Sequence, residues 1–123
     1  MSIAEPAAST LVDVRNPADR RRENRNPCRK SISIIPCTGE TVAALLLDCS
    51  AHGVGLSMPR AMRVGDEFMV NVNMPAPAVL LYTVRNCRQT PEAGYRIGAE
   101  FVGFIVAPAQ SSRDNIVDAL MKL

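Results

Sequence analysis

Short stretches in which apolar and polar residues alternate run through this chain from about residue 28 to residue 101. Alternation with a period of two is typical of β-strands that bury one face, and prolines and glycines separate the stretches. The pattern predicts six strands, at 28–35, 42–48, 54–58, 67–73, 79–88 and 95–101. Short strands joined by turns favour a closed antiparallel barrel or a sandwich, because both protect the sheet edges.

The period changes after Pro108, where the spacing of apolar residues becomes helical. Ser111 or Ser112 can cap a helix, and one apolar stripe of that helix comprises Ile116, Leu120 and Leu123. We expect residues 108–123 to pack on a barrel of residues 20–107, with the helix over one barrel opening. Residues 1–19 are small, polar and aperiodic, and predict a flexible tail.

Composition agrees with one small domain that has a real core. The chain has 123 residues, 47% of them hydrophobic, but only 4% aromatic, so the core should be aliphatic and rich in methionine. No stretch approaches the roughly 18–20 apolar residues of a membrane span, so membrane insertion is not expected. No signal peptide is apparent, and we therefore expect a cytoplasmic protein.

Four cysteines and one histidine offer little for a metal site. Cys28, Cys37, Cys49 and Cys87 never fall in a C-x-x-C spacing. We expect reduced, mostly buried cysteines and no metal.

The candidate binding site begins where the longest apolar run, 42–47, ends. There the sequence reads Asp48-Cys49-Ser50-Ala51-His52-Gly53-Val54-Gly55. Side chains two apart on a strand share a face, so Asp48 and Ser50 should project side by side. Gly53 and Gly55 should permit positive φ and close approach of a partner. This pattern favours a receptor for hydrogen-bond donors, although a plain polar turn has the same composition.

A basic segment precedes the first strand and contains Arg20, Arg21, Arg22 and Arg25. By itself such a segment is a solvated arm or a tether for nucleic acid or membrane. A turn centred near Thr38 pairs positions whose numbers add to about 75 or 76. Arg25 should therefore lie opposite Ser50 or Ala51, which brings the arm beside the polar loop.

Together these features resemble a PilZ domain. The resemblance rests on Arg21-x-x-x-Arg25, then Asp48-x-Ser50-x-x-Gly53 after a spacer of about twenty residues, then Val84-Arg85 and Tyr95-Arg96-Ile97-Gly98-Ala99-Glu100-Phe101. It covers roughly residues 20–106 and implies a mainly β fold, a six-stranded barrel that binds the bacterial second messenger cyclic di-GMP. The sequence departs from the family pattern in two places. Val54 separates Gly53 from Gly55, where the family commonly has adjacent glycines, and Asn26-Pro27 follows the second motif arginine.

The chemistry of these residues suits that ligand. Guanidinium groups bind the O6 and N7 acceptors of guanine, stack on its faces and bind phosphate, whereas a carboxylate accepts from the N1–H and N2–H₂ edge. We expect Arg21 and Arg25 to contact guanine and phosphate. We expect the Asp48 carboxylate to accept hydrogen bonds from the N1–H and N2–H₂ groups of guanine. Ser50 would add a hydrogen bond and Gly53 would allow close approach. Arg20 and Arg22 would help with phosphate, or simply be solvated charges.

Three functions remain open at this point. The first is a non-catalytic cyclic di-GMP receptor that needs no cofactor and signals to an unidentified protein by ordering its N-terminal arm. The second is a PilZ-like scaffold that binds proteins but no nucleotide. The third is a small barrel that binds nucleic acid polymers, which is disfavoured because such surfaces usually add aromatic platforms. An enzyme is not expected, because no phosphate loop, metal cluster or triad appears and His52 has no evident nucleophile partner.

Overall fold

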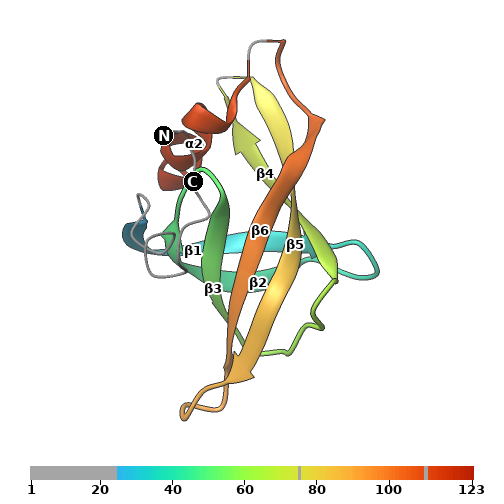
Figure 1. Cartoon of the computed structure of the whole chain (residues 1–123), viewed down its shortest axis with the longest axis vertical. Helices are drawn as coiled ribbons and strands as arrows, with labels where there is room; N and C mark the ends of the chain where they lie inside the picture. Colours follow the sequence, from blue (N-terminus) through green and yellow to red (C-terminus); the bar gives the residue numbers. More distant parts are fainter. Residues whose placement is uncertain (1–24, 75, 110) are drawn as a thin grey trace, which may run out of the picture.

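The computed structural model describes residues 25–74, 76–109 and 111–123, and this part of the chain is mainly β (Figure 1). The predicted tail, Arg20, Arg21 and Arg22 lie outside the described residues. The elements are β1 (Asn26–Pro36), β2 (Val42–Cys49), β3 (Gly53–Met58), β4 (Glu67–Asn73), β5 (Pro77–Gln89), β6 (Tyr95–Val106), a 3₁₀ turn η1 (Arg113–Asn115) and α2 (Ile116–Met121).

The six strands form a closed barrel in the order β1-β2-β3-β6-β5-β4. All neighbours are antiparallel, and pairing of Ile35 with Met69 joins β1 to β4 and closes the ring. The predicted barrel is therefore confirmed, and the sandwich is excluded. At this junction β1 and β4 pair at Ile35–Met69 and Pro36–Phe68, which protects that end of the two strand edges.

The β1–β2 hairpin has the register expected from its turn. Asn26 pairs with Cys49 and Ile34 with Val42, and a shift of one residue lies between these two pairs. In contrast, β6 continues to Val106 instead of ending at Phe101. Its last residues stay in the sheet because Val106 pairs with Val79 of β5. The register between β5 and β6 shifts before that pair is reached, and the alternation pattern does not reveal these shifts.

Side chains from all six strands fill the barrel with one hydrophobic cluster. Its aromatic rings form a continuous series of contacts. The centroids of the stacked Phe68 and Tyr82 rings are 5.5 Å apart, and the Phe101 ring meets Tyr82 edge-on at a centroid distance of 5.7 Å.

The expectation of mostly buried cysteines is wrong. All four are free thiols within the described residues, but only Cys49 is buried, and Cys37 is exposed.

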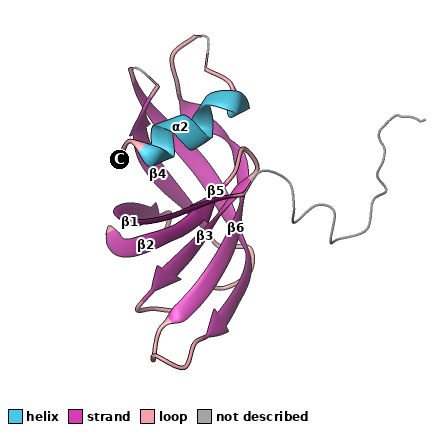
Figure 2. Ribbon diagram, turned by 90° about the vertical axis from the view of Figure 1, so that its left-hand side faces the viewer, coloured by secondary structure: helices cyan, strands magenta, loops and turns pink. Residues whose placement is uncertain are grey.

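The C-terminal helix is shorter than the pattern predicts. Ser112 caps η1 by accepting a hydrogen bond from the backbone of Asp114, and α2 follows. Ile116 and Leu120 belong to the barrel's hydrophobic cluster, so the helix extends the core at its contacts with β1 and β4 (Figure 2). Leu123 is 43% exposed, against expectation, because α2 ends at Met121.

No helix in the described ranges is long and apolar enough to span a bilayer.

Candidate functional site

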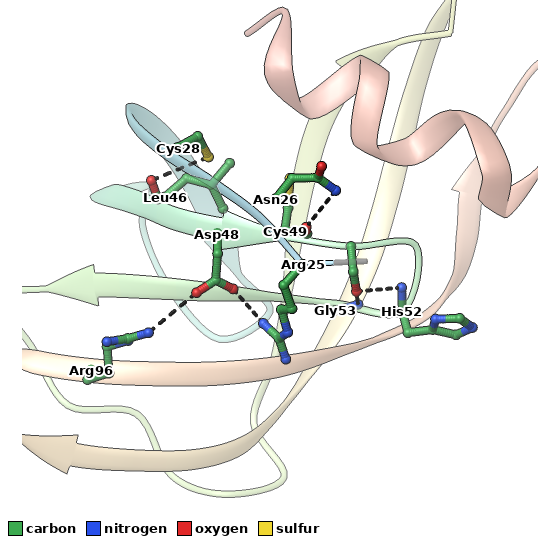
Figure 3. A network of polar contacts seen from close by, with 10 residues as sticks. Arg25, Asn26, Cys28, Leu46, Asp48, Cys49, His52, Gly53 and Arg96 are labelled. Atoms are coloured by element: carbon green, nitrogen blue, oxygen red, sulfur yellow. Dashed lines mark hydrogen bonds and ion pairs between the residues drawn. The ribbon is translucent and has the colours of Figure 1, made fainter. Parts of the chain in front are cut away.

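The carboxylate of Asp48 lies between two arginines from different parts of the barrel (Figure 3). Arg25, directly before β1, donates from Nη1 to Oδ1 at 2.5 Å. Arg96, near the start of β6, lies with Nη2 3.4 Å from Oδ2. Asp48 is 20% exposed and the arginine side chains are 46% and 41% exposed, so all three groups remain open to solvent on one side. Opposite charges at these distances hold the carboxylate in place without burying it.

Ser50 has a different position from the one expected. β2 ends at Cys49, so the strand alternation that predicted a face shared with Asp48 does not extend to Ser50, and Ser50 is buried. The Ser50 hydroxyl oxygen accepts the backbone N–H groups of His52 and Gly53 at 3.1 and 3.2 Å. Ser50 thus shapes the turn into β3, a common use of a serine at a loop start.

Gly53 and Gly55 lie in β3 and do not have positive φ, so that expectation is also wrong. Among the described residues, the glycine with positive φ is Gly65, at 97°. Gly53 is needed for a different reason: a Cβ there would lie 2.5 Å from the carbonyl oxygen of Ala99 on β6. The close partner of Gly53 is therefore the neighbouring strand.

A cavity of about 640 Å³ opens beside Asp48 on the outer surface of the barrel. It is lined by Arg25, Asp48, Gly55, Asn86, Arg88, Arg96, Ile97 and Gly98. Its charged side chains are three arginines and one carboxylate, which leaves it positive overall and suited to an anion. A second cavity of about 480 Å³ lies on the β1 side and shares Asp48 and Arg96 with the first.

The sequence motifs do not include Asn86, Arg88 or Arg96 as site residues. Arg88 pairs with Arg96, and Asn86 with Gly98, across the β5–β6 hairpin. The turn rule that placed Arg25 near Asp48 would also have paired these positions around the predicted turn at 89–94. The contact of Arg96 with Asp48 requires, in addition, that β3 and β6 be neighbours.

Cys49 follows Asp48 in the chain and faces the core. Burial, together with its contact with Cys28, raises the pKa of the Cys49 thiol to about 11. A thiol with that pKa stays protonated at neutral pH and is a poor nucleophile. It contributes to packing beside the site.

A family model of the PilZ domain matches residues 19–116, a range that contains both motifs and the arginine-lined cavity. The chain belongs to the PilZ domain family. This family binds cyclic di-GMP, and its members are generally non-catalytic receptors. The match also includes Arg20 and Arg21, which lie outside the described residues.

Among solved structures, the barrel is similar to that of the Bacillus subtilis inhibitor of motility MotI/DgrA, a PilZ-domain protein. The TM-score is 0.58 at 14% sequence identity, over 80% of this chain and 48% of that protein. Likeness at this identity shows the shared fold, and the chain spans about half the length of that neighbour. No curated protein matches the chain.

Proposed function

We propose that this PilZ domain is a receptor for cyclic di-GMP that acts without catalysis and passes the signal to a partner protein. The observation that supports this most strongly is the contact between Arg25 and Asp48. These residues come from the two motifs of the family's ligand site, and they meet at the edge of a positively charged cavity.

The ligand's chemistry agrees with the charges around that cavity. Cyclic di-GMP carries two phosphates and two guanines, so it presents two negative charges and several flat acceptor edges. Three arginines and one carboxylate give the cavity lining a net formal charge of +2. A dianion would neutralise that charge. Asp48 can accept from the N1–H and N2–H₂ edge of guanine, and arginines can bind O6, N7 and phosphate.

Ligand binding would change the partners of Asp48 and Arg25. Arg25 and Asp48 form an ion pair in the structure. In the complex, Arg25 would turn toward the nucleotide while Arg96 continues to hold Asp48 from the other side. Ser50 would act mainly by shaping the loop that carries these groups, and Gly53 by keeping β3 close to β6.

Arg20 and Arg21 would complete the site from the basic arm. The sequence of this arm has no apolar period to bury, and four arginines within six positions repel one another. Charge-assisted contacts to a dianion would offset the ~1–2 kcal/mol per residue that fixing a backbone requires. Ordering of the arm would then change the surface near the loop, which a protein partner could recognise.

A titration tests the proposal. Isothermal calorimetry with cyclic di-GMP, GTP and single-stranded RNA separates the three functions that the sequence leaves open. The proposal expects saturable binding of cyclic di-GMP, with much weaker binding of the other two. Failure of cyclic di-GMP to bind would leave the protein-binding scaffold as the better description, and tight RNA binding would favour the nucleic-acid barrel.

A further inference from the structure

The last part of β6 extends beyond its neighbour β3. Strand β3 pairs with β6 only as far as Gly53, which lies opposite Glu100. From Phe101 onward, β6 pairs with β5 alone among the described residues, apart from one hydrogen bond that the Phe101 N–H donates to the carbonyl oxygen of His52. The start of β5 and the end of β6 therefore continue together past the start of β3 (Figure 1).

Two bulges raise the number of exposed apolar residues in this part of β6. The register between β5 and β6 shifts at Val102 and again at Ile105, so each is an extra residue in the described ladder. Val102 and Ile105 are each 51% exposed, and Val106 is 55% exposed. Phe101 and Phe104 pack toward the core, where their ring centroids are 5.2 Å apart. The bulges therefore break the strict alternation of buried and exposed residues in favour of the outer surface.

The neighbouring outer surface of β5 is apolar as well. Val79 pairs with Val106, and Leu81 pairs with Gly103. A Cβ on Gly103 would meet nothing within 4 Å, so another molecule could approach the backbone closely at that residue. We call the following residues together the β5–β6 face: Val79, Leu81, Val102, Ile105 and Val106.

Polar residues border the β5–β6 face. Asn71 of β4 is exposed and pairs with Val79. At the opposite limit, Glu100 forms an exposed ion pair with Arg85. An exposed apolar centre with a polar border is typical of a surface that binds another protein.

The chemistry of the β5–β6 face favours a second copy of this chain as its partner. Its five side chains carry no charge and no hydrogen-bonding group, so they offer nothing that would select a charged partner. Contacts between identical subunits are more apolar than those between temporary partners. In a twofold dimer the same surface meets itself, and uncharged side chains can do so without repulsion.

We propose that this protein forms a symmetric dimer in solution in which the β5–β6 faces of two copies pack together. The dimer goes beyond the proposed function and does not depend on it. The cavity beside Asp48 is lined at the start of β6 by Arg96, Ile97 and Gly98. At a rise near 3.3 Å per residue, Val102 lies about 13 Å further along the strand than Gly98. The dimer therefore leaves the cavity open in both copies.

Analytical ultracentrifugation of the full chain tests the dimer, at concentrations from about 10 μM to about 1 mM. Val102→Lys and Ile105→Lys each put a charge on the β5–β6 face. Val64→Lys is the matched control, because Val64 is 67% exposed on the loop between β3 and β4. Half of each substituted side chain is already in solvent, so we expect the variants to fold, and circular dichroism verifies this. Val102→Ser is a milder variant that tests the same contact if a lysine variant does not fold.

The wild type should change from monomer to dimer within this range. We expect Val102→Lys and Ile105→Lys to raise the dissociation constant of the dimer by about tenfold or more, because each loses apolar burial and places a cation in the contact. Val64→Lys should change it by less than about twofold. In NMR spectra of the wild type, the amide signals of Leu81 and of residues 102–106 should shift as the concentration rises.

Each other result overturns the proposal. A wild type that sediments as a monomer up to about 1 mM has no such dimer. If the wild type dimerises and the variants of Val102 and Ile105 dimerise equally well, another surface forms the contact. An equal loss for Val64→Lys would indicate that added positive charge alone prevents association. Assemblies larger than a dimer would exclude a closed twofold contact.

Discussion

Arg25 and Asp48 are 23 positions apart in the chain, yet their side chains form an ion pair with Nη1 2.5 Å from Oδ1. The pair joins the arginine motif to the aspartate motif. A ligand that binds the same carboxylate oxygen or the same guanidinium nitrogen must compete with this ion pair. The free energy of the ion pair then enters the affinity of this PilZ domain for such a ligand.

Substitution of the motif residues should weaken ligand binding without unfolding the barrel. We expect Arg21→Ala and Arg25→Ala each to reduce the binding free energy of cyclic di-GMP by ~1–3 kcal/mol, the scale of a bidentate guanine contact. Asp48→Asn should have a similar effect, because an amide puts donors against the guanine N–H groups. Calorimetry measures the affinity and circular dichroism the fold.

Asp118→Asn is the matched control for Asp48→Asn, because Asp118 is 72% exposed on α2 and, within the described residues, pairs only with Lys122. It should leave binding unchanged. A double variant of Arg21 and Arg25 that binds like the wild type would refute the assigned site. Unfolding of the Asp48→Asn protein would instead mean that Asp48 serves the loop's structure.

Amide hydrogen exchange tests the proposed ordering of the arm. On saturation with cyclic di-GMP, new protection should concentrate at about residues 19–27 and 48–55, while the barrel strands change little because their core is already packed. Protection of the arm that is equal with and without ligand would contradict the mechanism.

Gly53→Ala should destabilise the fold, because the new Cβ would meet the Ala99 carbonyl oxygen at 2.5 Å. The contact is with backbone, so β3 and β6 must separate locally, at a cost of ~1–3 kcal/mol typical of overpacking. Urea denaturation measures the free energy of unfolding. Gly39→Ala is the control, since a Cβ there meets nothing within 4 Å. Equal stability of the two variants would show that β3 and β6 tolerate the extra methyl group.

The buried Cys49 thiol predicts a loss of stability in alkali. Its pKa is about 11 in the folded chain, against an ordinary value of 9.0, so the unfolded state releases the proton first as the pH rises. The contribution to stability is fully present below pH 9.0 and disappears as the pH approaches 11. Urea denaturation at a series of pH values should show this decline, and Cys49→Ala should reduce it.

At pH 8, mass spectrometry should find alkylation at exposed Cys37 well before Cys49. Rapid alkylation of Cys49 at that pH would contradict its burial.

Tyr82→Phe should stabilise the barrel. The Tyr82 side chain is fully buried, and its hydroxyl has no hydrogen-bond partner in the part of the chain that is described. Burial of an unsatisfied polar group costs ~1–3 kcal/mol, and phenylalanine keeps the ring stacked on Phe68. We expect the free energy of unfolding to rise by about 1 kcal/mol. Tyr95→Phe, at a partly exposed position, should leave it unchanged. A drop for Tyr82→Phe would mean that the hydroxyl has a partner after all.

The sequence by itself determined that there are six strands, their order along the chain and the approach of Arg25 to Asp48. Each depends on local information: alternation of apolar residues marks a buried face, and a short turn sets the register of the strands that it joins. The approach of Arg25 to Asp48 was predictable for that reason, since one hairpin separates them.

The tertiary structure decided everything that depends on β3 lying beside β6. Those strands are far apart in the chain, and no turn sets their register, which comes from closure of the barrel around its core. This pairing brings Arg96 to Asp48, gives Gly53 the Ala99 carbonyl as its neighbour, and places Gly55 opposite Gly98. A glycine is conspicuous in a sequence, but the atom that requires it to be glycine is set by the packing of distant segments.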